Sequence, residues 1–287
     1  MLETLISLFI NGLNSAALLI LTCLGLVVII GLMDVFNMAT GEFIMLGAYI
    51  TYISSTVLGL PFLVSLVLSF VVTVLVGIVF ERLLLSPLRK KRGDGLLLTY
   101  GLSIVLQQVI TIIYGPEMRY VSVPFKGNIE IGNLLISYYN LFTIFVAIVT
   151  FAVTFIIFFK TKLGMQIRAT TQNRAMTECL GIKTPMLDTF TFAFGCGITG
   201  ICGCILAPVR TVHPLMGASY LTDALMSVVV GGVNNILGTV VASLGISESL
   251  VMFGGFFNEV NVKILVFITI IVILRFKPDG LFAKKGR

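Results

Sequence analysis

Long apolar runs alternate with short polar segments along this chain. They predict helices at about 4–32, 42–58, 61–84, 95–113, 138–159, 187–208, 219–232, 237–255 and 261–275. A run of about 20 apolar residues spans the hydrocarbon core of a bilayer as one helix. The stretch at 219–232 is too short to cross comfortably, so we expect a broken or re-entrant helix there. The pattern therefore predicts an all-α polytopic membrane protein with eight or nine transmembrane helices.

Composition supports a lipid environment for the chain. Hydrophobic residues make up 57% of it, charged residues 11%, and the mean hydropathy is +1.08. A soluble domain usually has about 25% charged residues. We attribute the net charge of +6 to contact with anionic lipid headgroups and expect no nucleic-acid partner. The first residues lack the basic region of a secretory signal, so the first apolar run is expected to remain as a span.

The basic residues predict the topology. Fourteen of the 19 Lys and Arg residues lie in three segments, Arg89–Arg92, Lys160–Lys183 and Arg275–Arg287. Basic loops of membrane proteins collect on the cytoplasmic side. Nine crossings place all three segments inside, with the N-terminus outside, the C-terminus in the cytoplasm and the loop 114–137 outside.

Two segments of the chain look alike. The first apolar run ends in Asp34–Gly47 and the sixth ends in Pro208–Tyr220, and a short apolar run follows each of them. Short, glycine-interrupted segments at corresponding places of oppositely oriented halves indicate an inverted repeat with a pathway between the halves. We expect one transmembrane domain over 1–287, with halves at about 1–137 and 138–287. Chance similarity within glycine-rich membrane sequence is the alternative.

The fourth run carries polar residues at every fourth position. Thr99, Ser103, Gln107 and Thr111 share one helix face, and Gln108 flanks it. Polar side chains at this depth are not expected to face lipid, because their hydrogen bonds would go unmade. The face predicts a polar wall of a substrate path. Interhelical hydrogen bonding, worth about 0.6 kcal/mol per contact, is the alternative.

Acidic residues at membrane depth are costly and indicate function. Asp34 and Glu42 bracket the first broken element, Asp223 lies in the second, and Glu248 lies in the eighth run. Each is a candidate proton relay. The favoured interpretation of Glu42 and Asp223 is that they cap the N-termini of half-helices. The sequence leaves the role of Glu248 open.

Small residues recur at helical spacing in two runs. Gly195, Thr199 and Gly203 do so in the sixth run, and Gly238 and Gly245 in the eighth. Small residues at this spacing let helices approach closely, so both patterns predict packing faces.

Motifs for chemistry are missing from the chain. There is no Gly-x4-Gly-Lys-Ser/Thr, no HExxH and no second cysteine pair beside Cys202 and Cys204. We therefore expect no catalytic site, no metal and no cofactor. Uphill transport would draw its energy from an ion gradient or from a partner.

The inner loop 160–186 carries a short apolar face on an otherwise basic segment. Ala175, Met176, Cys179 and Leu180 form that face, and Gly181 ends the helix. The pattern is typical of a knob that fits the groove of a soluble partner. A helix lying on the membrane surface is the alternative.

Five ordered motifs resemble the permeases of branched-chain amino acid type ABC transporters, and together they cover nearly the whole chain. They are Asn37–Tyr49 (NMATGEFIMLGAY), Ser86–Arg89, Ala169–Ile182, Val229–Thr239 and Lys277–Phe282. Thr40 stands where this family usually has histidine, so any role of that histidine is absent. Within the family, Gly238–Ala242 and Gly280–Arg287 are most similar to urea permease subunits.

The resemblance implies a bacterial inner-membrane importer. It implies a second, homologous permease subunit, two cytoplasmic ATPases that use ATP, and a periplasmic binding protein. Urea or a short amide is the expected substrate, a branched-chain amino acid is the alternative, and a passive solute channel is the alternative of another class.

We expect two sets of functional residues. The substrate pathway is expected at Asn37, Thr40, Glu42, Thr99, Ser103, Gln107, Gln108, Asp223, Gly231, Gly232 and Asn234. ATPase coupling is expected at Ala175, Met176, Glu178, Cys179, Leu180 and Gly181.

Overall fold

A computed structural model describes residues 2–33, 37–88, 95–125, 127–131, 134–233, 235–255, 258–278 and 280–282. The helices are α1 Leu2–Met33, α2 Thr40–Thr51, α3 Phe62–Phe80, α4 Ser86–Leu88, α5 Gly95–Tyr114, α6 Tyr138–Lys160, α7 Lys162–Gln172, α8 Arg174–Cys179, α9 Thr184–Leu206, α10 Met216–Gly231, α11 Ile236–Gly254 and α12 Glu259–Phe276. Two π-helical turns, Tyr52–Val57 and Glu81–Leu85, prolong α2 and α3.

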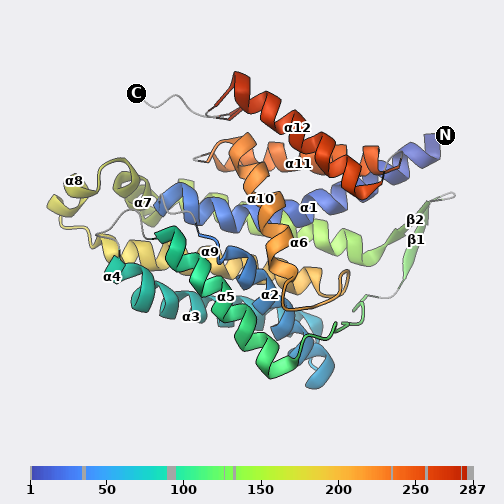
Figure 1. Cartoon of the computed structure of the whole chain (residues 1–287), viewed down its shortest axis with the longest axis horizontal. Helices are drawn as coiled ribbons and strands as arrows, with labels where there is room; N and C mark the ends of the chain where they lie inside the picture. The colour runs from blue at the N-terminus through green and yellow to red at the C-terminus, as the bar shows by residue number, and fades with distance from the viewer. Residues whose placement is uncertain are drawn as a thin grey trace.

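The helices follow the predicted apolar runs to within a few residues, and the all-α polytopic fold class is confirmed. Among the described residues, six helices are long and apolar enough to cross a membrane. As expected, α10 is shorter, and it crosses the long helices at a steep angle in Figure 1. The antiparallel hairpin of β1 Asn128–Ile131 and β2 Leu134–Ser137 was not predicted from the apolar pattern.

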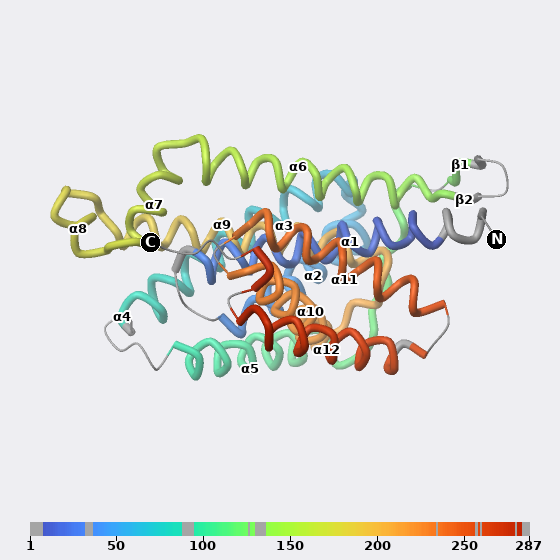
Figure 2. The backbone as a smooth tube through the Cα atoms, turned by 90° about the horizontal axis from the view of Figure 1, so that it is seen from above, coloured from blue at the N-terminus to red at the C-terminus, as the bar shows by residue number. Residues whose placement is uncertain are grey.

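Two long helices form the centre of the bundle. In α1, 72% of the apolar window is buried, and in α9 78%, against 28–33% in α3, α5, α6 and α11. Helix α2 packs on α9, and ten of its 12 residues are buried. The other helices surround this centre (Figures 1 and 2). The outer helices therefore present their apolar side chains outward, where lipid acts as the solvent.

Glycines bring the central helices into backbone contact. A Cβ added at Gly203 of α9 would collide with the carbonyl oxygen of Ile44 in α2. Gly200 of α9 lies directly against Gly47 of α2 in the same way. In lipid there is no hydrophobic driving force between helices, so helix pairs are stabilised by close packing of this kind. The packing face predicted for the sixth run is present.

Several helix pairs make reciprocal contacts. The first turns of α2 and α10 meet where Gly41 and Gly217 each face the other's carbonyl oxygen. In addition, α3 packs on α9 and α11 packs on α1. An inverted repeat would produce reciprocal pairs of this kind, and the repeat itself stays a prediction.

The two ends of the bundle differ in content. The N-terminal end of α1 and the β-hairpin lie at one end, and α4, α7 and α8 lie at the other (Figure 2). The basic segment Arg89–Arg92 lies outside the described residues, but α4, which precedes it, ends on the side of α7 and α8. This division follows the charge pattern of the sequence.

Candidate functional site

A buried carboxylate joins α2 to α5. Ser103 Oγ donates a hydrogen bond to Glu42 Oε1 at 2.9 Å, and Gln107 Nε2 donates to the same oxygen at 2.7 Å. The Glu42 side chain is 1% exposed. We call these three residues the Glu42 cluster. The polar face predicted on the fourth apolar run therefore points into the protein and meets an acidic partner.

The chain entering α2 is tied to the same face of α5. The amide N–H of Met38 donates to Thr99 Oγ1 at 3.3 Å. Asn37 Oδ1 accepts from the amide of Ala39 at 3.0 Å, and Thr40 Oγ1 donates to the carbonyl of Asn37, also at 3.0 Å. Six predicted pathway residues, Asn37, Thr40, Glu42, Thr99, Ser103 and Gln107, are thus brought together.

Two polar atoms of this region have no hydrogen-bond partner among the described residues. They are Glu42 Oε2 and Asn37 Nδ2, and both are buried. An unsatisfied buried polar group costs about 1–3 kcal/mol. Glu42 belongs to the first turn of α2, which meets the first turn of α10 at Gly41 and Gly217, so the positive ends of two helix dipoles converge in this region. The region can offer an acceptor, a donor and a positive potential to a polar solute.

The remaining predicted acidic and amide residues lie elsewhere. Gln108 is exposed on the outside of α5 rather than joined to the Glu42 cluster. Asp223 does not cap a half-helix, because α10 begins at Met216; instead it pairs with Lys263 of α12 at 3.2 Å. Glu42 does lie in the first turn of α2, but its side chain makes no capping hydrogen bond there and reaches α5 instead. The capping interpretation is wrong for Asp223.

Two glycines at the C-terminal end of α10 end the helix and contact the tail. Gly231 packs on the backbone of Thr239, and Gly232 has φ of 97°, a conformation that favours glycine. The amide of Leu281 donates to the carbonyl of Val230 at 2.8 Å. The motifs Val229–Thr239 and Lys277–Phe282 therefore meet here. Because they lie far apart in the chain, the sequence did not indicate this contact. Asn234 lies outside the described residues.

Glu248, whose role the sequence left open, faces α1. Its two carboxylate oxygens are buried without a partner among the described residues, and they occupy the space beside Gly12. A side chain at position 12 would displace them, so the glycine makes room for the carboxylate.

The inner loop forms two helices instead of one. The amphipathic α7 follows α6, and Asn173 Oδ1 caps α8 by accepting from the amide of Met176 at 3.0 Å. Met176 is 62% exposed and Leu180 is 73% exposed. Gly181, with φ of 80°, ends the segment. The other predicted coupling residues, Ala175, Glu178 and Cys179, are exposed as well.

A hollow borders α8. Its volume is about 490 Å³, and it is lined by Glu178, Ile182, Lys183, Thr184, Pro185 and Met186. The exposed side chain of Met186 stands at its edge. The exposed apolar side chains of α8 project from this surface, and the hollow beside them forms a recess.

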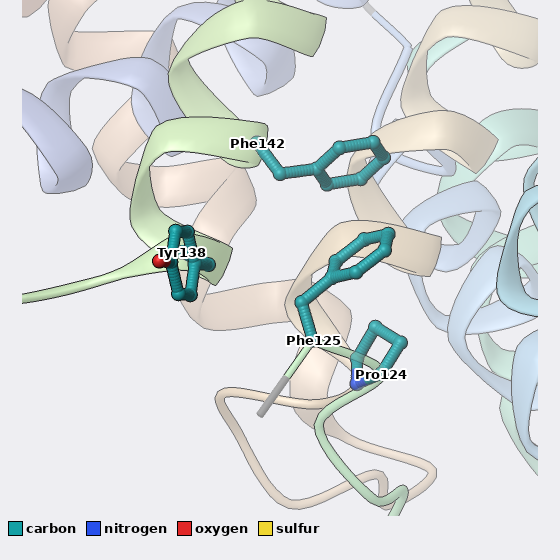
Figure 3. A pocket seen from close by; sticks show the side chains of 4 residues that line it. All are labelled: Pro124, Phe125, Tyr138 and Phe142. Carbon is teal, nitrogen blue, oxygen red and sulfur yellow. The ribbon is translucent and has the colours of Figure 1, made fainter. Parts of the chain in front are cut away.

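A second hollow is aromatic. Its volume is about 480 Å³, and it is lined by Pro124, Phe125, Tyr138 and Phe142 (Figure 3). The rings of Phe125 and Phe142 lie 5.1 Å apart, measured between centroids. This lining shares no residue with the Glu42 cluster. No periodic pattern in the sequence predicted this hollow.

We expect the Glu42 cluster to respond to substitution in one of two ways. If it lines a path, Gln107→Leu removes a hydrogen bond worth about 1–2 kcal/mol in solute passage and Ser103→Phe blocks passage, while assembly survives. If it only joins helices, both variants reduce assembly and leave the transport of surviving complexes unchanged. The measurement is solute uptake normalised to the amount of assembled complex. Normal normalised uptake in both variants would assign the face to packing.

Comparison with known proteins identifies the family. Residues 8–274 match the family described as branched-chain amino acid transport system / permease component. The chain is 27% identical to the high-affinity branched-chain amino acid transport system permease protein BraD of Pseudomonas aeruginosa, covering 96% of this chain and 94% of BraD. It is 26% identical to LivH of Escherichia coli K12, a high-affinity branched-chain amino acid transport system permease protein, with the same coverage.

A more distant likeness covers half of the chain. It is 28% identical to the ribose import permease protein RbsC of Haemophilus influenzae over 50% of this chain and 47% of RbsC. No solved protein structure matches the chain. These relatives are transport permeases rather than enzymes. With a family match over almost its whole length, the chain belongs to the branched-chain amino acid transport system permease component family.

Proposed function

We propose that this protein is a permease subunit of an ABC importer for branched-chain amino acids. The observation that carries the proposal is the family match over residues 8–274. Two relatives that cover nearly the whole chain are named for transport of these amino acids. None of the similar proteins is named for urea, so the comparisons favour the amino acid alternative over urea or a short amide.

The chemistry of the Glu42 region supports a zwitterionic solute. Glu42 Oε2 is a free acceptor suited to an ammonium group. The converging N-termini of α2 and α10 suit a carboxylate. Apolar side chains of the central helices surround the region, as an aliphatic substrate requires. Urea carries no charged group, so it would use neither the acceptor at Glu42 nor the positive potential of the helix N-termini.

The inner surface supports coupling to a separate ATPase. The exposed Met176 and Leu180 project beside the hollow that Met186 borders. Exposed apolar groups beside a recess are suited to the groove of a partner protein. A passive channel would need no such surface. The assembly we propose holds this permease, a homologous second permease, two ATPases that use ATP, and a periplasmic binding protein.

We propose that the N-terminus faces the outside and the C-terminus the cytoplasm of a multi-pass bacterial inner-membrane protein. Cys179 is the one exposed cysteine of the five, so it can report on the side of α8. An impermeant thiol reagent should label it in inverted vesicles and spare it in intact cells. The exposed Tyr120→Cys, in a Cys179→Ser background, should behave in the opposite way. Labelling of Cys179 in intact cells would contradict the proposed orientation and indicate the opposite one.

The substrate is tested with the complete complex in proteoliposomes. With the cognate binding protein and ATP present, we expect uptake of leucine, isoleucine or valine and none of urea. ATP-driven uptake of urea alone would restore the urea interpretation. Uptake that proceeds without ATP would favour a channel.

A further inference from the structure

One arginine ties the coupling segment to the first turns of α9. Arg174, at the start of α8, donates through Nη2 to Asp188 Oδ2 at 2.8 Å and to Thr184 Oγ1 at 3.0 Å. Its Nε donates to Glu178 Oε1 at 3.2 Å, and Thr184 Oγ1 donates to the same oxygen at 2.5 Å. We call these four residues the Arg174 clamp. They link both ends of α8 to the N-terminal end of α9.

The clamp is held by charge and by partial burial. The Asp188 side chain is 9% exposed, whereas that of Arg174 is 44% exposed. A carboxylate in this position needs its cation, because a buried charge without a partner is costly. The hydrogen bond from Thr184, aided by Arg174, lowers the pKa of Glu178. Glu178 is therefore an anion throughout the neutral pH range, and protonation below its lowered pKa would loosen the clamp.

Besides the clamp, α8 is joined to α9 by a short loop and through α7, which packs on both helices. The loop consists of residues 180–183, and Gly181 in it has φ of 80°. A loop with glycine in the left-handed region fixes the relative position of two helices weakly. The bonds that cross from α8 to α9 are those of Arg174 to Asp188 and Thr184 and that of Thr184 to Glu178, and they help to fix how α8 sits on α9.

Helix α9 leads from the clamp to the Glu42 region. It runs through the centre of the bundle, where Gly200 and Gly203 contact the backbone of α2 at Gly47 and Ile44. Backbone contacts of this kind leave no flexible side chain to absorb a displacement. Glu42 lies less than one turn before Ile44 on α2. A movement of α9 is thus passed to the helix that holds the candidate solute site.

We propose that the Arg174–Asp188 pair is a positioning element that converts displacement of α8 by the ATPase into movement of α9 and α2. This inference rests on the proposed function, because it requires a partner that pushes on α8. Arg174 and Asp188 are assigned no contact with the solute or with ATP. Their role is to prevent α8 from pivoting on its loop when the ATPase moves.

The test uses the complete complex in proteoliposomes and Asp188→Asn. We expect the ATPase to be recovered with the permease and to hydrolyse ATP, while solute transported per ATP falls about 5- to 150-fold, the range of typical coupling free energies. The charge-swapped pair Arg174→Asp with Asp188→Arg should recover part of the loss. Arg168→Gln is the control, because Arg168 stacks on Phe159 of α6 and takes no part in the clamp.

A second readout does not depend on the solute. A cysteine at Met38, beside Thr99, is expected to change its reactivity when ATP is added to the wild-type complex, and to lose that change in Asp188→Asn. If the proposed substrate is incorrect, this readout still reports on the clamp. Unchanged transport per ATP together with an unchanged Met38→Cys response would overturn the inference. So would equal loss of assembly in Asp188→Asn and in the milder Arg174→Lys, since that outcome assigns the clamp to stability alone.

Discussion

Gly203→Ala is expected to destabilise the permease strongly, although alanine is the better helix former. The new Cβ would press on the carbonyl oxygen of Ile44 and lie 2.9 Å from the amide nitrogen of Ala48. Helix propensity favours alanine by about 0.5–1 kcal/mol. Overpacking costs about 1–3 kcal/mol and occasionally more. The overpacking cost exceeds the gain in helix propensity here, because the opposing atoms belong to the backbone and cannot rotate away.

Gly245→Ala is the matched control for this prediction. Gly245 also lies within a helix, α11, but a Cβ there would meet no atom within 4 Å. We expect unchanged or slightly raised stability. The measurement is the apparent melting temperature of the purified permease in detergent. Equal melting temperatures for the Gly203 and Gly245 variants would contradict the close approach of α9 to α2.

These two glycines also mark what the sequence can predict about packing. Both belong to small-residue patterns at helical spacing, and both patterns were interpreted as packing faces. The pattern on α9 meets α2 closely at Gly203, whereas the pattern on α11 meets α10 at Gly238 but faces open space at Gly245. Spacing defines which face of a helix is small, but it does not say which neighbour covers that face. The path of the chain through the bundle decides this.

The Glu42 cluster shows the same limit for polar residues. The period of four correctly placed Thr99, Ser103 and Gln107 on one face that avoids lipid. Their partner, Glu42, lies about 60 residues earlier in the chain, and no local pattern links the two. Gln108 follows Gln107 directly, yet one helical step turns its side chain outward. Asp223 was paired by tertiary contact with Lys263, which the sequence did not indicate.

The inner segment was predicted in outline only. Its apolar exposed residues and its stop at Gly181 were clear from the sequence. The Arg174 clamp was not, because arginine on a basic inner loop is already explained by the charge rule for membrane proteins. A residue that satisfies one general rule gives no hint of a second role. The contacts of its guanidinium group with Asp188 and Glu178 supply that hint.

Leu180→Asp is expected to abolish transport by removing the ATPase from the complex. Leu180 is 73% exposed, so the substitution leaves the interior of the permease unchanged. Loss of a central apolar contact in an interface costs about 2 kcal/mol or more. That corresponds to a weakening of ATPase binding of roughly 30-fold. The measurement is the amount of ATPase recovered with the permease, with uptake as a second readout.

Leu180→Lys distinguishes this docking role from a helix that lies on the membrane surface. Anionic headgroups attract lysine and repel aspartate, so a surface helix would tolerate Leu180→Lys and be harmed by Leu180→Asp. An apolar groove on the ATPase would reject both side chains, because each buries a charge without a partner. We therefore expect both variants to lose the ATPase to a similar degree. Normal ATPase recovery with Leu180→Lys would move α8 from the protein interface to the lipid surface, and the coupling role of Met176 and the Arg174 clamp would have to be abandoned with it.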